Sequence, residues 1–194
     1  MHIFRYLAFF LIFACSFPTY ADNNNCRKLG PLVGEVSAET FTALSDVTDC
    51  LDAGFKTVLL INSQGGDVEY GFGSFDLLAE HQNRKLLTTV AYGNVASAAV
   101  MIFLAGNERL MSCNSTLFLH EPFNVLEGGI KTISDMKYLT ESIQLTLSTM
   151  VKIHAKETGL SEEQIKTLFR ANTTLTAKEA VKLGFATGTT KKCN

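Results

Sequence analysis

Residues 86–106 read LLTTVAYGNVASAAVMIFLAG, and this stretch decides the fold class. Its first seven residues are apolar, aromatic or β-branched, as in a strand buried within a parallel sheet. Gly93-Asn94 is expected to turn the chain. From Ala96 to Ala105 nearly every side chain is apolar, which predicts a helix buried on all sides that ends at Gly106. The stretch therefore predicts a strand, a tight turn and a buried helix, with Ser97 at the start of that helix.

The segments on either side repeat this alternation of strand and helix. Continuous apolar runs predict buried strands, and apolar side chains three or four residues apart predict helices. Strands are expected at 31–36, 57–61, 86–92 and 116–120, with a turn at 62–66. Helices are expected from Ser37 to about 51, and over 68–78, 96–105 and 133–157, followed by two short helices opened by the capping boxes Ser161/Gln164 and Thr176/Glu179. The order indicates an α/β fold of βαβ units with a mostly parallel sheet, in one domain over 22–194.

Composition and charge are those of a folded domain. The 194 residues suffice for one α/β domain with a sizeable core. Hydrophobic residues make up 46% and charged residues 19%, which excludes a disordered chain. The formal net charge is −2, so neither nucleic acid nor an anionic membrane is expected as a partner.

The first 21 residues have the layout of a cleaved secretory signal. His2 and Arg5 give a weakly basic start, residues 7–17 are almost wholly apolar, and small residues precede a cleavage site after Ala21. We therefore expect a periplasmic or secreted protein. A membrane anchor is the alternative, but the apolar stretch is shorter than the roughly 20 residues of a spanning helix. Lipid attachment at Cys15 is a further alternative, which a bulky residue two positions earlier makes a poor fit.

Export would place the remaining cysteines in an oxidising compartment. Their number is even, so two disulfides are expected, and their spacing does not choose among the three pairings. A metal site is not expected, because no two of them are spaced as Cys-x-x-Cys. Free buried thiols would better suit a cytosolic protein. The four residues are Cys26, Cys50, Cys113 and Cys193.

Three segments carry candidate chemistry, each at or just after the end of a predicted strand. Asn62–Asp67 (NSQGGD) contains adjacent glycines that let backbone N–H groups approach a ligand. Ser97 is flanked by small residues, and the free N–H groups of a helix start would favour an anion beside its hydroxyl. His120 ends an apolar strand, where it could act as a base. Taken singly, each segment has a plainer interpretation: an ordinary turn, a helix cap and a partly buried histidine.

Taken together, these segments resemble the proteolytic subunit of Clp protease. The sequences INSQGG (61–66), GNVASA (93–98) and FLHEP (118–122) occur in the order and spacing of the family forms INSPGG, GQAASMG and MIHQP. A fourth match, NTTLTAKEAV (172–181), resembles the family segment DRFLSAPEAVEYG. The likeness covers about residues 31–188. It implies a fold of the ClpP/crotonase type, a spiral of βαβ units with a long handle helix.

The resemblance also implies a role for each matching position. Ser97 would be the nucleophile of a serine endopeptidase that works through an acyl-enzyme, and His120 would be its general base. The backbone N–H groups of Gly66 and Ala98 would form the oxyanion hole. An extended peptide would bind by β-strand addition. The residues implied in that binding are Gly65, Gly128 and Gly129.

Asn172 departs from the family pattern, which has an aspartate as the third catalytic residue. An aspartate fixes the tautomer of the histidine and stabilises the imidazolium, whereas asparagine can accept a hydrogen bond but supplies no charge. In a well-studied serine protease the same change lowers turnover about 10⁴-fold. The departure implies a slow enzyme, a site without catalysis, or a different acid. The candidates for that acid are Asp67, Glu121 and Asp135.

The resemblance further implies partners. The apolar face of the handle helix needs a partner, so homo-oligomers are expected. The substrates would be peptides or unfolded proteins. Cytosolic members of the family receive chains from an ATP-driven unfoldase, and an exported member would have neither ATP nor that partner. We therefore expect action without ATP, without a cofactor and without an ATPase partner.

Three other classes of protein are alternatives. The first is a binding or scaffold protein that keeps the fold and not the catalysis. The second is an acyl-CoA enzyme of the related crotonase fold, which the signal disfavours because coenzyme A is not expected outside the cytoplasm. The third is a Ser-Lys peptidase, which needs a lysine beside Ser97. The nearest lysines, Lys131 and Lys137, fall where the resemblance predicts the substrate strand and the handle helix.

Overall fold

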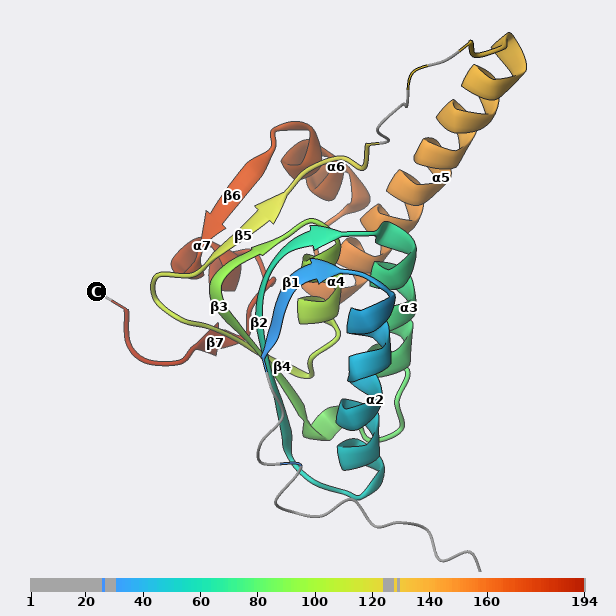
Figure 1. Cartoon of the computed structure of the whole chain (residues 1–194). Coiled ribbons are helices and arrows are strands. Elements are labelled where there is room, and N and C mark those ends of the chain that lie inside the picture. The colour runs from blue at the N-terminus through green and yellow to red at the C-terminus, as the bar shows by residue number, and fades with distance from the viewer. Residues whose placement is uncertain (1–25, 27–30, 124–127, 129, 194) are drawn as a thin grey trace, which may run out of the picture.

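The structure is a computed structural model that describes Cys26 and residues 31–123, 128 and 130–193 (Figure 1). The expected signal at 1–21 and Gly129 lie outside the described residues. The strands are β1 (Leu32–Val36), β2 (Thr57–Gly66), β3 (Leu87–Ala96), β4 (Glu108–Met111), β5 (Thr116–Leu119), β6 (Thr173–Thr176) and β7 (Gly188–Thr189). The helices are α2 (Ala38–Asp52), α3 (Val68–Ala79), α4 (Ala98–Leu104), α5 (Ile133–Thr158), α6 (Glu162–Arg170) and α7 (Ala177–Lys182), with a 3-10 turn η1 at Arg84–Leu86.

One seven-stranded sheet organises the chain, and its strands run in the order β1-β2-β3-β4-β7. All of these neighbours pair in parallel. β5 also pairs in parallel with β3, and the one antiparallel pair is β5 with β6. The α/β class and the mostly parallel sheet predicted from the sequence are therefore confirmed.

β3 is the central strand because it changes partners along one edge. Its first half, Thr88–Ala91, pairs with β4, and its second half, Asn94–Ala96, pairs with β5. Gly93 lies between the two halves with a φ of 77°. The expected turn at Gly93-Asn94 is therefore wrong: the glycine redirects a strand that continues to Ala96.

The turn expected at 62–66 is wrong for a similar reason. These residues continue β2, because Asn62 and Gly66 pair with Val33 and Val36 of β1. The strand accommodates two glycines at positive φ and a shift in register near its end. The strands β4, β6 and β7 were not expected from the sequence.

The helices follow the predicted spacing closely. α2 and α3 pack together on one side of β1 and β2, and α4 lies between the sheet and the helices α3 and α5 (Figure 1). α4 begins two residues later than expected, and all seven of its residues are buried. The capping boxes of α6 and α7 are present as predicted.

α5 is anchored at one end only. It begins at a capping box between Thr132 and Asp135 and ends at Gly159, whose φ of 79° terminates the helix. Its buried residues, Met150, Val151 and His154, all lie in the second half. The first half projects beyond the body of the molecule (Figure 1). Among the described residues, no helix is both long and apolar enough to cross a bilayer.

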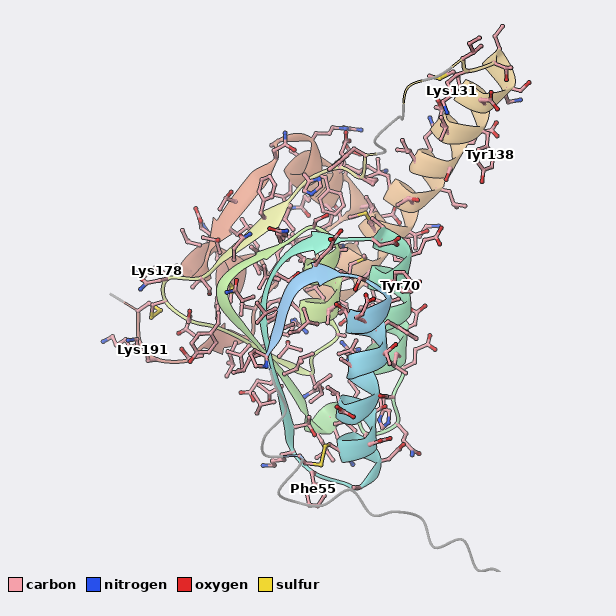
Figure 2. All side chains as sticks on the ribbon, in the orientation of Figure 1. Phe55, Tyr70, Lys131, Tyr138, Lys178 and Lys191 are labelled. Carbon is pink, nitrogen blue, oxygen red and sulfur yellow. A yellow bond between two sulfur atoms is a disulfide. The ribbon has the colours of Figure 1, made fainter. Side chains whose placement is uncertain are left out.

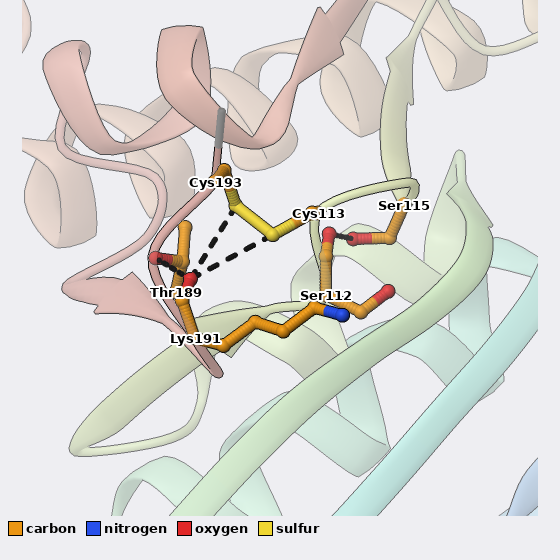
Figure 3. The surroundings of a disulfide bond; sticks show 6 residues. All are labelled: Ser112, Cys113, Ser115, Thr189, Lys191 and Cys193. Carbon is orange, nitrogen blue, oxygen red and sulfur yellow. Dashed lines mark hydrogen bonds between the residues drawn. A yellow bond between two sulfur atoms is a disulfide. The ribbon is translucent and has the colours of Figure 1, made fainter.

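Two disulfides form, as expected, and the fold selects one of the three pairings. Cys26 bonds to Cys50 of α2, and Cys113 bonds to Cys193. The second bond ties the end of the chain to the loop ahead of β5 (Figure 3). In that loop the hydroxyl of Ser115 donates to the carbonyl of Ser112 at 2.7 Å.

Candidate active site

Ser97 joins β3 to α4 in a backbone conformation that is rare for a residue with a side chain. Its φ and ψ are 53° and −128°, and a positive φ costs an L-residue about 1–2 kcal/mol. Two neighbours fix it: its N–H donates to the carbonyl of Phe118 at 2.9 Å, and α4 is buried directly after it. Ser97 occupies the N-cap position, but its hydroxyl makes no capping hydrogen bond. The half-buried hydroxyl is therefore not used by the helix.

The end of β2 approaches Ser97 more closely than any side chain would permit. A Cβ placed on Gly65 would lie 2.6 Å from the Cβ of Ser97 and 3.2 Å from the backbone nitrogen of Ala98. Gly65 has a φ of 95° and its N–H donates to the hydroxyl of Ser63 at 3.2 Å. The structure thus brings Gly65, Ser97 and Ala98 together, and Gly66 follows directly, paired with Val36 of β1.

His120 leaves the strand next to the one that carries Ser97. Ala96 and Phe118 are register partners in the parallel pair β3–β5, so Ser97 and His120 emerge from the same end of adjacent strands. The imidazole is half-buried and lies beside the rings of Phe118 and Phe123, with centroid distances of 5.3 and 5.7 Å.

The hydrogen bond of the imidazole is made within its own segment. Nδ1 of His120 lies 2.7 Å from the backbone carbonyl oxygen of Glu121. Within the described part of the chain, no hydrogen bond joins this ring to Ser97 or to Asn172. Phe118, Phe123 and the carbonyl of Glu121 are site contacts that the sequence did not indicate. The adjacency of His120, Glu121 and Pro122 was the one available signal.

Asn172 directly precedes β6, the strand that pairs antiparallel with β5. The last register pair is Leu119 with Thr173, so His120 and Asn172 are the residues that adjoin this end of the pair. Its φ is 49°, a left-handed conformation that asparagine tolerates better than most residues. Its N–H donates to the carbonyl of Phe169, and its side chain is exposed.

The three alternative acids are engaged elsewhere. Asp67 caps α3 by accepting from the N–H groups of residues 69 and 70. Asp135 caps α5, and the hydrogen bonds from Thr132 hold the pKa of this carboxyl below its usual value. Glu121 lies 3.9 Å from Arg170.

The lysines required by a Ser-Lys site lie away from Ser97. Figure 2 shows Lys131 at the outer end of the projecting part of α5. Lys137, on the same part of the helix, pairs with Glu141 at 3.8 Å. Gly128 is exposed, and its neighbour Gly129 lies outside the described residues.

Comparisons with known proteins agree with this geometry. A family model described as Clp protease matches residues 32–192. The ATP-dependent Clp protease proteolytic subunit 1 of Corynebacterium diphtheriae is 30% identical over 158 residues, which cover 80% of this chain and 74% of that protein. The subunit 1 of Rhodococcus jostii is 31% identical over 159 residues, covering 80% and 70%. A solved structure of a ClpP1 mutant from Listeria monocytogenes matches with a TM-score of 0.70 and 24% identity, over 84% of this chain and 92% of that chain, which shows the shared fold.

Proposed function

The chain belongs to the Clp protease family and is a serine endopeptidase, and we propose that Ser97 is its nucleophile and His120 its general base. One observation carries this proposal. The hydroxyl of Ser97 is held in a strained turn, caps no helix, and emerges beside the strand that ends at His120. Strained backbone of this kind is concentrated at functional sites, where the surrounding structure holds a side chain in a conformation it would not otherwise adopt.

The proposed reaction is acyl transfer in two steps. The Ser97 oxygen attacks the peptide carbonyl while His120 takes its proton, and His120 then delivers that proton to the leaving amine. Water hydrolyses the resulting acyl-enzyme. The N–H groups of Gly66 and Ala98 would hold the oxyanion, a role supported by the close approach of Gly65 to the backbone nitrogen of Ala98.

A fluorophosphonate probe tests the assignment of the nucleophile. We expect the probe to label the wild-type protein and not Ser97→Ala. The matched control is Ser45→Ala on the solvent face of α2, where the hydroxyl only donates to the carbonyl of Thr42, and this variant should label like wild type. Equal labelling of Ser97→Ala and wild type would refute the assignment.

We also propose that the protein assembles as a homo-oligomer through α5. The projecting half of that helix exposes large apolar side chains, which a second copy would cover. Ile133, Tyr138 and Leu145 are 89%, 70% and 71% exposed. The substrate would be an extended peptide or a loosely folded protein, bound near the segment that contains Gly128.

Export and independence of ATP belong to the same proposal. Disulfides persist in oxidising compartments, so the two bonds of this chain support an exported protein. When the full-length chain is expressed, cell fractionation should find the protein outside the cytoplasm. It should lack residues 1–21, and its disulfides should be oxidised. The purified protein should cleave a loosely folded substrate in the absence of ATP. A cytoplasmic protein that retains Met1 would contradict the proposed export.

A binding or scaffold role is the second candidate function. The observation that favours it is that, among the residues that the structure describes, no hydrogen bond joins the ring of His120 to the hydroxyl of Ser97. Folded, assembled protein that neither reacts with the probe nor cleaves peptides would support this role.

A further inference from the structure

We propose that the main-chain carbonyl of Glu121, and not the side chain of Asn172, sets the tautomer of His120. This inference rests on the proposed role of His120 as the general base. It names the group that takes the place of the aspartate whose charge this chain lacks.

Nδ1 of His120 forms a hydrogen bond with the backbone carbonyl oxygen of Glu121. A carbonyl oxygen can only accept, so at 2.7 Å the proton must lie on Nδ1. A neutral imidazole with its proton on Nδ1 leaves Nε2 free to accept. Nε2 is the nitrogen that takes the proton of the serine in a Ser-His site. The carbonyl therefore selects the tautomer that catalysis needs.

The direction of this carbonyl is fixed by the sequence that follows it. Glu121 precedes Pro122, and a proline disfavours helical backbone at the residue before it, which shifts that residue to extended conformations. The ring of Pro122 also fixes its own φ. The acceptor is thus oriented before any substrate binds.

Two phenyl rings contact the imidazole. The rings of Phe118 and Phe123 are tilted from it by 33° and 35°. Phe123 is 72% exposed, and the ring of His120 is an aromatic contact that it makes at the surface. The two phenyl rings contact the imidazole, and the carbonyl of Glu121 accepts from its Nδ1.

An amide side chain would perform this task less well than a carbonyl. The terminal group of Asn172 can present either an oxygen or an NH₂ group to the ring, and the NH₂ group would hold the wrong tautomer. The carbonyl oxygen of Glu121 can only accept a hydrogen bond, so it holds one tautomer. Asn172 and His120 adjoin the last register pair of β5 and β6, but the exposed side chain of Asn172 makes no hydrogen bond to the ring within the residues described. Its substitution should therefore leave the tautomer unchanged.

The test reads the tautomer directly. Protein labelled with ¹⁵N-histidine is assembled in its native form, and magic-angle-spinning ¹⁵N spectra are recorded at about pH 8.5, where unperturbed imidazoles are neutral. The signal that is missing in His120→Gln identifies the ring. We expect a protonated Nδ1 and a bare Nε2 in wild type and in Asn172→Ala. Probe labelling of Ser97 in Asn172→Ala should fall by less than about 100-fold relative to wild type, against the roughly 10⁴-fold loss known where an asparagine replaces a required aspartate.

A second variant, Pro122→Gly, removes the restriction on the orientation of the Glu121 carbonyl. Pro122→Gly frees the backbone of Glu121, so we expect mixed tautomers at His120 and labelling at least about 10-fold slower, because a displaced catalytic group is costly. Pro31→Gly, at an exposed position ahead of β1, is the matched control and should leave both readings unchanged. A Pro122→Gly variant that keeps both the tautomer and the labelling rate would overturn the proposal.

The two proposals fail in different ways. A proton on Nε2 in wild type, or one that moves to Nε2 in Asn172→Ala, overturns the role of the carbonyl while labelled Ser97 still supports the hydrolase. A loss of labelling of about 100-fold or more in folded Asn172→Ala does the same. Absence of labelling in wild type refutes the nucleophile, and the ¹⁵N spectra still decide the tautomer.

Discussion

Gly65→Ala is the substitution by which the geometry around Ser97 can be tested most directly. The added Cβ would lie 2.6 Å from the Cβ of Ser97 and 2.7 Å from the carbonyl oxygen of Ala96. Both atoms belong to the backbone or its first side-chain carbon, so neither can rotate away. A clash of this kind lowers the free energy of unfolding by about 1–3 kcal/mol. A side chain at positive φ lowers it by roughly another 1–2 kcal/mol. We expect Gly65→Ala to lower the free energy of unfolding by about 2–5 kcal/mol in total.

Gly34→Ala is the matched control for this change. Gly34 has a φ of 93°, against 95° for Gly65, and no atom lies within 4 Å of the position of its Cβ. The control therefore carries the backbone strain alone, about 1–2 kcal/mol. Urea unfolding at one protein concentration measures both losses, and the difference between the variants isolates the contact with Ser97.

The functional effect should separate the two variants further. A shift of Ser97 by about 1 Å is enough to lower the rate of a positioned reaction about 10²-fold. Gly65→Ala should therefore react with the fluorophosphonate about 100-fold more slowly than wild type, while Gly34→Ala should react normally. If the two variants lose equal stability and label at rates within about 3-fold of each other, the close approach of β2 to Ser97 is not what forms the site.

Two further expectations concern stability. Burial lowers the pKa of His154 from 6.5 to about 4. Between these two pH values the imidazole is protonated in the unfolded state and neutral in the folded state. Stability is then fully present above pH 6.5 and falls by up to about 3 kcal/mol as the pH drops to about 4, and urea unfolding of His154→Leu should lack this slope. Replacing Cys113 and Cys193 together by serine should cost more than replacing Cys26 and Cys50, roughly 4 against 3 kcal/mol, because the bonds span 80 and 24 residues. If urea unfolding shows equal losses of stability for the two double variants, the entropy of the unfolded chain is not the main source of disulfide stabilisation.

Local sequence signals predicted the regular elements well. The apolar spacing of α5 and the two short capping boxes each depend on residues a few positions apart, and all three were confirmed. The predicted strand ends at Ile61 and Tyr92 were wrong, because a glycine marks unusual backbone without saying whether the strand stops. Pairing with β1 and β5, which decides that question, involves residues distant in sequence.

The sequence by itself determined that a serine and a histidine each lie at the end of a buried strand, because both the strand pattern and the motif are local. Only the tertiary structure decided that β3 and β5 are neighbours, that Gly65 touches Ser97, and that the ring of His120 meets the carbonyl of Glu121. It also chose the disulfide pairing. These features depend on strand register and on contacts made after the chain has folded, and residue types alone do not specify either.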